Sequence, residues 1–294
     1  MTDGAALQGG GSDSVLTEGR RSLMDEEVRF AADLYQGHAG FYDRYRLAYP
    51  EAMIRDLAER ALASGSGRLL DLACGTGQLA FALRPWFSEV WAVDQEPDMV
   101  RVVRAKATAA GAAEVRAVVA GAENLDAEPG HFDLVAIGNA FHRLNRDLVA
   151  ARVFGWLEQG GYLALCWSDG PLEGEQRWQQ ALAAVVSSWK QKLGAADRVP
   201  AGWNEPRRAR PDGQVLGDAG FEMAGRREYA AEHRWRLPEL AGFIRATSVF
   251  PADIPASLAA AFEADLAASV GPLGRDGEFP QTVSFACELA RRPA

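Results

Sequence analysis

The chain has 294 residues with a net charge of −9, and 48% of them are hydrophobic. This length allows one large or two ordinary domains with a full core, and the acidic balance disfavours nonspecific binding to nucleic acid. No apolar run reaches the roughly 18–20 residues that cross a bilayer, so no membrane partner is predicted. The three cysteines, at Cys74, Cys166 and Cys287, are far apart along the chain. We expect small buried thiols in a reducing cytoplasm, with neither a disulfide framework nor a zinc site.

The N-terminal part is predicted to consist of a disordered tail, a helical cap and an aromatic segment within the cap. Residues 1–24 are polar and rich in glycine and serine, which predicts a disordered tail without the apolar core of a signal peptide. Residues 25–63 are predicted to form a helical cap, with helices at 25–36 and 50–63. Between these helices, residues 41–50 hold three tyrosines and two arginines. This segment either packs on the edge of the domain or forms a flap over a ligand.

The most informative stretch is a strand, a turn and a helix start in succession. Residues 68–73 are an apolar run with one acid, Asp71, and the turn at 75–77 has a glycine at each end. Glycines permit a sharp turn and close approach of a ligand, and free N–H groups at a helix start favour electron-rich ligand atoms. A dinucleotide-binding turn has the same spacing, but a carboxylate at Asp71 disfavours a pyrophosphate and suits a cationic ligand head. The alternative is that Asp71 only caps a neighbouring backbone group.

An acid also ends the second predicted strand, at residues 90–94. Asp94 is placed there for bidentate hydrogen bonds to ribose hydroxyls, a feature shared with NAD enzymes. Alternatively, Asp94 caps the helix predicted at 97–110, which begins with a proline and is followed by Gly111. Both readings place this carboxylate at the end of a buried strand.

The alternation of strands and helices continues through the first half of the chain. The remaining elements there are strands at 115–119, 131–138 and 162–167 and a helix at 147–158. This pattern predicts an α/β fold, a Rossmann-like doubly wound and mostly parallel sheet, within a core spanning residues 64–170. Ligands bind at the carboxyl edge of such sheets, where the loop after the fourth strand carries Asn139 and His142.

The pattern changes after residue 170. A long helix at 174–193 carries an apolar stripe, and we expect it to form a helical lid on the ligand edge of the sheet, within an insertion spanning 171–212. Residues 213–294 are predicted to complete the sheet. This part contains strands at 221–235 and 281–289 and, between them, a helical insertion at about 237–270.

Three motifs resemble one protein family. Asp-Leu-Ala-Cys-Gly-Thr-Gly at 71–77 resembles the first motif of class I S-adenosylmethionine-dependent methyltransferases. Tyr-x-x-Tyr-Arg-x-x-Tyr-Pro at 42–50 resembles a segment of the UbiE-like, or type 11, group, and Phe-Asp-Leu-Val at 132–135 is frequent in the family. The resemblance is best over residues 41–167. It implies a seven-stranded sheet with an antiparallel strand inserted beside strand six, S-adenosyl-L-methionine as cofactor and S-adenosyl-L-homocysteine as product.

The resemblance also implies roles for individual residues. Tyr42, Tyr45 or Arg46 closes over the methionine part of the cofactor, and Asp71 lies near its ammonium group. Ala122 and Glu123 match the small residue and acid that read the adenine edge. The full candidate set for cofactor binding is Tyr42, Arg46, Asp71, Gly75, Thr76, Gly77, Asp94, Gln95, Ala122, Glu123 and Asn139.

His142 is the candidate catalytic residue, because it alone of the four histidines sits in the loop after the fourth strand. Histidine with a pKa of about 6.5 is suited to accept a proton from the acceptor near neutral pH. Alternatively, His142 only hydrogen-bonds within its loop. An amine acceptor would also need no enzymic base, because a neutral amine can attack first and lose its proton to water afterwards. No metal ligands are predicted.

The expected function is methyl transfer to a small molecule. Ala-Phe-His at 140–142 and Ala-Thr-Ser-Val-Phe at 246–250 look similar to methyltransferases of actinobacterial natural-product pathways, which points to antibiotic biosynthesis. The acceptor is expected to be an amine, such as an amino sugar, or a hydroxyl of a secondary metabolite. The alternatives are a quinone-ring or carboxyl methyltransferase, a nicotinamide-dependent oxidoreductase, and a noncatalytic cofactor-binding protein. We expect a cytoplasmic monomer or homodimer.

Overall fold

The computed structural model of the chain describes residues 30–31, 33–61 and 65–294. The described residues form one seven-stranded sheet, in the order β3-β2-β1-β4-β5-β7-β6. The strands are β1 (Gly67–Leu72), β2 (Phe87–Asp94), β3 (Val115–Val119), β4 (Phe132–Gly138), β5 (Leu157–Ser168), β6 (Glu222–Trp235) and β7 (Phe279–Arg291). Neighbouring strands from β3 to β5 are parallel, whereas β7 runs antiparallel to both β5 and β6. The predicted α/β sheet, mostly parallel with an antiparallel strand inserted beside β6, is therefore confirmed.

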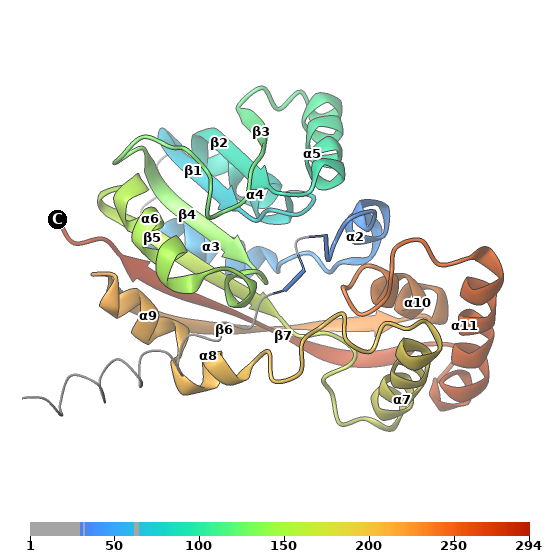
Figure 1. The fold of residues 1–294 in the computed structure, drawn as a ribbon. Coiled ribbons are helices and arrows are strands. Elements are labelled where there is room, and N and C mark those ends of the chain that lie inside the picture. Colours follow the sequence, from blue (N-terminus) through green and yellow to red (C-terminus); the bar gives the residue numbers. More distant parts are fainter. Residues whose placement is uncertain (1–29, 32, 62–64) are drawn as a thin grey trace, which may run out of the picture.

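Helices cover both faces of this sheet (Figure 1). The α-helices of the described residues are α2 (Ala39–Tyr45), α3 (Glu51–Arg60), α4 (Gln78–Leu83), α5 (Pro97–Ala110), α6 (Arg146–Trp156), α7 (Arg177–Lys192), α8 (Glu205–Ala209), α9 (Asp212–Asp218), α10 (Leu237–Arg245) and α11 (Ala256–Ser269). Short 3-10 helices are η1 (Arg84–Trp86), η2 (Phe141–Arg143) and η3 (Gly271–Leu273). α3 and α4 contribute to the core on one face, and α6 and α9 to the core on the other. The chain is thus doubly wound, as predicted.

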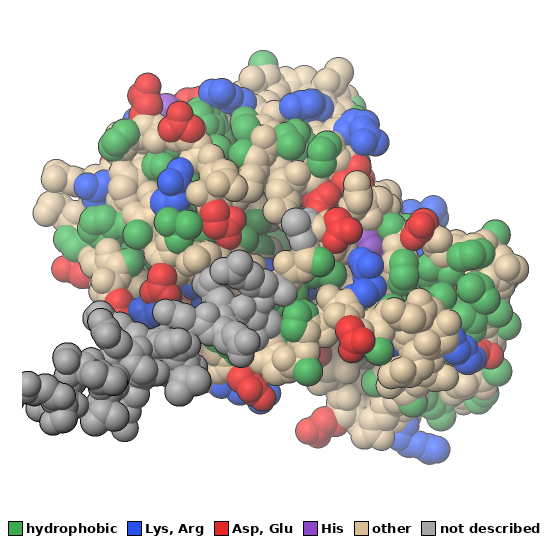
Figure 2. Space-filling view, viewed as in Figure 1, with side chains coloured by type: hydrophobic (Ala, Val, Ile, Leu, Met, Phe, Trp, Pro, Cys, Tyr) green, Lys and Arg blue, Asp and Glu red, His purple; other side chains and the backbone are tan. Residues whose placement is uncertain are grey.

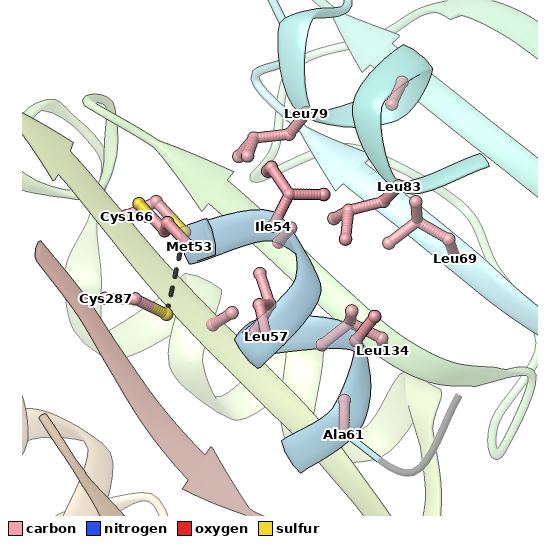
Figure 3. Close-up of a cluster of buried hydrophobic side chains, with 14 of the residues drawn as sticks. Met53, Ile54, Leu57, Ala61, Leu69, Leu79, Leu83, Leu134, Cys166 and Cys287 are labelled. Atoms are coloured by element: carbon pink, nitrogen blue, oxygen red, sulfur yellow. Dashed lines mark hydrogen bonds between the residues drawn. The ribbon is translucent and has the colours of Figure 1, made fainter. Parts of the chain in front are cut away.

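The core beneath α3 joins this helix firmly to the sheet. Met53, Ile54 and Leu57 of α3 belong to the same buried cluster as Leu69 of β1 and Leu134 of β4, and Met53 lies beside Cys166 of β5 (Figure 3). Burying a side chain of this size stabilises the fold by about 1.5–3 kcal/mol. α3 is therefore part of the core of the sheet, and the boundary between the N-terminal cap at 25–63 and the core at 64–170 stays a prediction.

All three cysteines are buried and free, as expected. The pairing of β5 with β7 nevertheless places Cys166 directly opposite Cys287, with the two sulfur atoms 3.8 Å apart (Figure 3). The two cysteines are 121 residues apart in the sequence, so no local pattern could predict this contact. Two of the thiols that were expected to be isolated are therefore neighbours in the centre of the sheet.

The N-terminal region differs from its prediction. Residues 33–37 form turns whose hydrogen bonds join residues three apart, so the described end of the helix predicted at 25–36 is not helical. The rest of that helix and the tail predicted at 1–24 lie outside the described residues. The first described helix is α2, which the aromatic segment itself forms. Its C-cap, Arg46, is already extended, with ψ of 136°.

A helical lobe stands at one end of the long strands β6 and β7, where α7, α10 and α11 gather (Figure 1). The apolar stripe of α7 packs in this lobe against buried residues of α10, α11 and the strand ends, among them Trp235, Phe262 and Phe279. α7 thus packs within the helical lobe, and its expected role as a lid on the ligand edge of the sheet stays a prediction. Periodicity identified the buried face of α7, but its partners lie more than 40 residues further along the chain.

Charged side chains on the surface and the apolar lengths of the described helices bear on the predictions about nucleic acid and membranes. On the face shown in Figure 2, acidic and basic side chains are interspersed. Within residues 30–31, 33–61 and 65–294, no helix is both long and apolar enough to span a bilayer.

Candidate active site

A cavity of about 260 Å³ opens at the carboxyl ends of β1, β2 and β4. We call it the first cavity, and its lining includes Tyr42, Arg46, Gly75, Asp94, Gln95, Ala122, Glu123, Asn139 and Arg143. Eight of these nine residues belong to the predicted cofactor-binding set. The topology explains why they meet, since parallel strands bring their carboxyl ends to the same edge of the sheet.

Asp94 fastens the glycine turn to the end of β2. Its Oδ2 accepts a hydrogen bond from Gly75 N at 2.8 Å, and its Oδ1 accepts one from Glu96 N at 2.9 Å. Burial raises the pKa of Asp94, and the two N–H donors oppose that shift. An ionised carboxylate has about four acceptor positions, so Asp94 keeps capacity for hydroxyl donors in the cavity.

Asp71 lies under the turn instead of in the first cavity. It is fully buried, and its Oδ2 accepts a hydrogen bond from Ala80 N at 2.8 Å, in the first turn of α4. Burial raises the pKa of Asp71 to about 7. The alternative considered for this residue, capping of a neighbouring backbone group, therefore describes the contact that the structure shows.

Two other candidate residues also face away from the first cavity. Thr76 is fully buried, and its backbone carbonyl accepts a hydrogen bond from Lys106 Nζ. A Cβ at Gly77 would point at the side chains of Phe81 and Val103, at 3.1 and 3.3 Å. Both side-chain positions thus point away from the first cavity, and the part of Thr76 and Gly77 in cofactor binding stays a prediction. Gly77 serves the turn through its φ of 82°, which favours glycine.

Tyr42 and Arg46 cover the turn from the end of α2. A Cβ at Gly75 would lie 2.9 Å from Tyr42 Cε1, so the ring rests directly on the turn. The Arg46 guanidinium lies 5.2 Å from the centroid of the Tyr42 ring and 5.3 Å from that of Phe243. No carboxylate of the described chain lies within 4.0 Å of this guanidinium. Arg46 is therefore a cation held between rings and open to an anionic ligand group.

The opposite wall comes from the loops after β3 and β4. Glu123 Oε1 accepts a hydrogen bond from Asn145 N at 2.9 Å, so it ties the two loops together. Asn139 has φ of 53°; its Oδ1 accepts a hydrogen bond from Ser168 N, and its Nδ2 donates to Tyr49 Oη. Both side chains line the first cavity while holding its wall in place.

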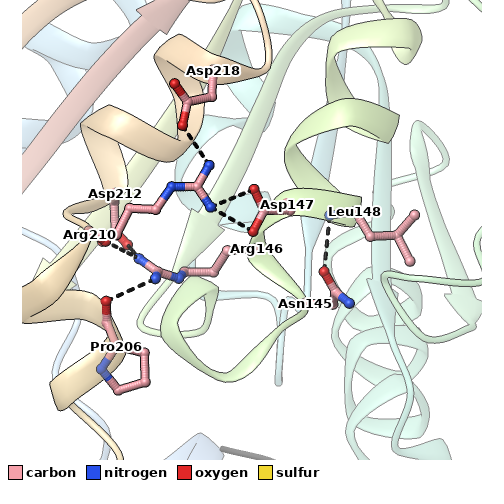
Figure 4. A network of polar contacts seen from close by, with 8 residues as sticks. All are labelled: Asn145, Arg146, Asp147, Leu148, Pro206, Arg210, Asp212 and Asp218. Carbon is pink, nitrogen blue, oxygen red and sulfur yellow. Dashed lines mark hydrogen bonds and ion pairs between the residues drawn. The ribbon is translucent and has the colours of Figure 1, made fainter. Parts of the chain in front are cut away.

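The loop after β4 is anchored from outside by an ion-pair network (Figure 4). Arg146 Nη1 lies 3.0 Å from Oδ1 of Asp212, which is almost completely buried, and Arg210 contacts both oxygens of Asp147. Asn145 caps α6 by accepting a hydrogen bond from Leu148 N. This network fixes the start of α6 and thereby the position of η2, which carries His142.

His142 does not line the first cavity. Its Nε2 accepts a hydrogen bond from Arg143 Nε at 3.1 Å, and its ring lies 5.0 Å from that of Trp203. Burial, with nearby arginines led by Arg143, lowers the pKa of His142 to about 3. The interpretation of His142 as a general base depended on an ordinary pKa near 6.5, and that premise is wrong.

His142 instead lines a second cavity of about 240 Å³. The two cavities share Phe30, Tyr35, Arg46, Asn139 and Arg143, so they adjoin. The second cavity extends toward the helical lobe, where its lining includes Trp203, Phe243 and Ser248. Trp203 was among the aromatic residues expected to line an acceptor pocket, whereas Arg143, Phe243 and Ser248 were not. Arg143 follows His142 directly, but no local pattern links it to Phe243, which is a hundred residues away.

Comparison with known proteins supports the interpretation of the fold. A family model described as a methyltransferase domain matches residues 69–161. The chain is 32% identical over 147 residues to an uncharacterized methyltransferase of Mycobacterium tuberculosis, covering 50% of this chain and 56% of that protein. It is 35% identical over 158 residues to a demethylmenaquinone methyltransferase of Thermus thermophilus, covering 53% and 64%. The chain thus spans little more than half the length of the curated relatives it matches.

Solved structures of other proteins have the same fold as this chain. A proposed type II methyltransferase of Anaeromyxobacter dehalogenans aligns with a TM-score of 0.53 at 19% identity, covering 85% of this chain and 98% of that one. A proposed methyltransferase of Bacillus halodurans aligns with a TM-score of 0.51 at 19% identity, covering 83% and 100%. Residues 69–161 therefore match a methyltransferase domain, and the sheet has the fold of solved methyltransferases.

The methyltransferase-domain match divides the site into two parts. Residues 69–161 include the glycine turn, Asp94, Glu123 and Asn139, which together form most of the first cavity. Trp203, Phe243 and Ser248 of the second cavity lie outside the matched segment. The part shared with the family therefore forms the turn and the sheet edge, and the chain beyond residue 161 shapes the adjoining space.

Proposed function

We propose that this chain transfers a methyl group from S-adenosyl-L-methionine to a small-molecule acceptor, with S-adenosyl-L-homocysteine as product. The observation that carries the proposal is the first cavity, at the carboxyl edge of a sheet with the methyltransferase fold. A glycine turn and a strand-end carboxylate meet there with an arginine that has no carboxylate partner among the described residues. When bound, the cofactor supplies an electrophilic methyl group.

The residues of the first cavity fit the chemistry of this cofactor. Asp94 keeps acceptor positions for the ribose hydroxyls. Arg46, which has no carboxylate partner among the described residues, offers a charge-assisted hydrogen bond to the methionine carboxylate. The small side chain of Ala122 and the acid Glu123 flank space for the adenine. Asp71 supports the turn by capping α4.

We assign the second cavity to the acceptor. It adjoins the first cavity through shared residues, and its rings, Trp203 and Phe243, exclude water from a bound molecule. Positioning of the acceptor in a shielded site is the main contribution that this chain makes to the reaction. We propose an amine, such as that of an amino sugar, or a hydroxyl of a secondary metabolite as the methylated group, with a role in antibiotic biosynthesis in the cytoplasm. The Thermus relative, named a demethylmenaquinone methyltransferase, favours a quinone ring as the second candidate.

Binding of S-adenosylhomocysteine tests the cofactor directly. A ligand at 100 times its Kd stabilises the native state by about 2.7 kcal/mol, which raises the melting temperature by roughly 5–10 °C. We expect this shift with S-adenosylhomocysteine and none with NAD. A shift with NAD alone would indicate an oxidoreductase instead. Transfer of radiolabelled methyl groups from S-adenosylmethionine to a cell extract separates an enzyme from a noncatalytic binding protein.

Replacing His142 with glutamine should leave the shape of the pH–rate profile unchanged. With a pKa near 3, His142 is neutral throughout pH 5–9 and has no proton to gain or lose there. Asp71 and Glu96, whose pKa values are raised to about 7, should affect the wild type and the variant alike. We expect turnover to fall less than tenfold.

A general base would behave differently. Its loss typically costs about 10²–10⁴-fold in rate. A loss of that size in His142→Gln, together with the disappearance of an ionisation near pH 6.5, would restore His142 as the base. The sign of the stability effect is an independent check: protonation of His142 opposes folding, so the free energy of unfolding of the wild type should fall more than that of the variant as the pH drops below 6.5.

A further inference from the structure

Two adjacent side chains of the second cavity hold buried nitrogen atoms that have no hydrogen-bond partner within the described part of the chain. These atoms are His142 Nδ1 and Arg143 Nη1. Because His142 Nε2 accepts a hydrogen bond from Arg143 Nε, the proton of the neutral imidazole belongs on Nδ1. Both unpartnered atoms are therefore N–H donors. A buried donor left without an acceptor costs about 1–3 kcal/mol, so the site gains from a ligand that accepts from both.

The charge around these donors is positive. The charged groups acting most strongly on His142 are all arginines, led by Arg143. Two of them, Arg146 and Arg207, share Asp212 as their partner. Arg143 has no carboxylate within 4.0 Å among the described residues.

The contacts of Arg143 are with neutral groups. Its guanidinium lies 5.4 Å from the ring centroid of Phe30 and 4.8 Å from that of Tyr35, and Nη2 is 3.4 Å from Ser248 Oγ. A buried cation without a counterion is costly to maintain, so an anionic ligand group would be favoured here.

One acid of the second cavity, Glu173, interacts with Arg46 and not with Arg143. Asp169 and Glu173 also line it, and Glu173 is influenced by Asp169 and by Arg46. Burial and Asp169 raise the pKa of Glu173, which reduces its negative charge. The cavity therefore has an acidic side associated with Arg46 and a cationic corner at Arg143.

We propose that Arg143 and His142 bind a carboxylate group of the methyl acceptor, with Arg143 Nη1 and His142 Nδ1 donating to its oxygen atoms. The assignment of this carboxylate to the acceptor rests on the proposed methyltransferase function. Phe30 and Trp203 pack on the imidazole, so an acceptor reaches the donors by displacing one of these rings. The apolar part of the acceptor then lies along Trp203 and Phe243. The substrate class is a small carboxylic acid with an apolar or aromatic body.

Matched acids and amides test this proposal without knowledge of the natural acceptor. The probes are benzoate against benzamide and indole-3-carboxylate against indole-3-carboxamide, which differ mainly in charge. Calorimetry or ligand-observed NMR is carried out on the full chain, with and without S-adenosylhomocysteine. We expect each acid to bind at least tenfold more tightly than its amide, in keeping with about 1.5–3 kcal/mol for hydrogen bonds to charged groups.

Variants assign the preference to Arg143. Arg143→Gln should weaken binding of the acids at least tenfold and leave the amides unchanged. The control Arg101→Gln removes the same charge from an exposed position on α5 and should change neither affinity. Equal binding of acid and amide by the wild type, or no binding of either, would overturn the proposal even if Arg143→Gln fails to fold.

The same measurements separate the two hypotheses. Binding of S-adenosylhomocysteine without a preference for acids would contradict the carboxylate site alone. A preference for acids that Arg143→Gln abolishes, in a chain that does not bind S-adenosylhomocysteine, would contradict the methyltransferase function and leave a carboxylate-binding site.

Discussion

Replacing Gly75 with alanine should weaken S-adenosylhomocysteine binding by roughly 10- to 100-fold, whereas the same replacement at Gly111 should not. Gly75 has φ of 55°, and a Cβ there would lie 2.9 Å from Tyr42 Cε1. The Tyr42 ring must then move from its place on the turn, and overpacking of this kind typically costs 1–3 kcal/mol. Isothermal titration calorimetry measures the loss.

Gly111 is a matched control for the backbone strain. It has φ of 58° after α5, and a Cβ there would meet no atom within 4 Å. Alanine should therefore carry the same left-handed strain at both positions, and only Gly75→Ala should displace Tyr42. Similar affinities in the two variants would show that Tyr42 does not take part in cofactor binding.

Replacing Asp94 with alanine should reduce both stability and cofactor affinity. The N–H groups of Gly75 and Glu96 lose their acceptor, and each buried donor left unsatisfied costs about 1–3 kcal/mol. Loss of hydrogen bonds to the ribose should weaken S-adenosylhomocysteine binding by roughly 1–3 kcal/mol more, or up to about 100-fold. Urea denaturation and calorimetry measure the two effects separately.

Two further variants sharpen this experiment. Asp126→Ala removes an exposed acid from a loop and should change neither quantity. Asp94→Asn keeps one oxygen acceptor, so its stability should be intermediate. Because burial raises the pKa of Asp94, ionisation of this group opposes folding as the pH rises, and the disadvantage of Asn should shrink toward high pH. Unchanged affinity in Asp94→Ala would remove Asp94 from the cofactor site.

Local patterns predicted the sheet and one cavity wall well. α5 has the predicted bounds because Pro97 at its start and Gly111 after its end mark a helix independently of its surroundings. The meeting of Gly75 with Asp94 also followed from sequence, since both lie at the carboxyl ends of adjacent parallel strands. These features depend on short-range rules and on one general property of parallel sheets.

The features that the sequence did not reveal depend on contacts that only the fold creates. The period of α7 showed an apolar stripe but not that α10 and α11 would cover it. The acid at Asp71 suggested a ligand, whereas its oxygen meets a backbone N–H nine residues further on. The pKa of His142 is set by burial and by arginines that the fold brings close, so its residue type alone indicated the wrong proton chemistry.

The place of β7 within the sheet has a consequence for the order of folding during synthesis. β6 pairs only with β7 among the described strands, and β7 lies between β5 and β6 although it is made last of the seven. Strands β2 to β5 can pair as the ribosome releases them, since each finds a parallel neighbour already made. β6 and much of the helical lobe must wait, exposing apolar surface, until β7 emerges more than forty residues later. The nascent chain is therefore most exposed to aggregation shortly before the last strand is completed.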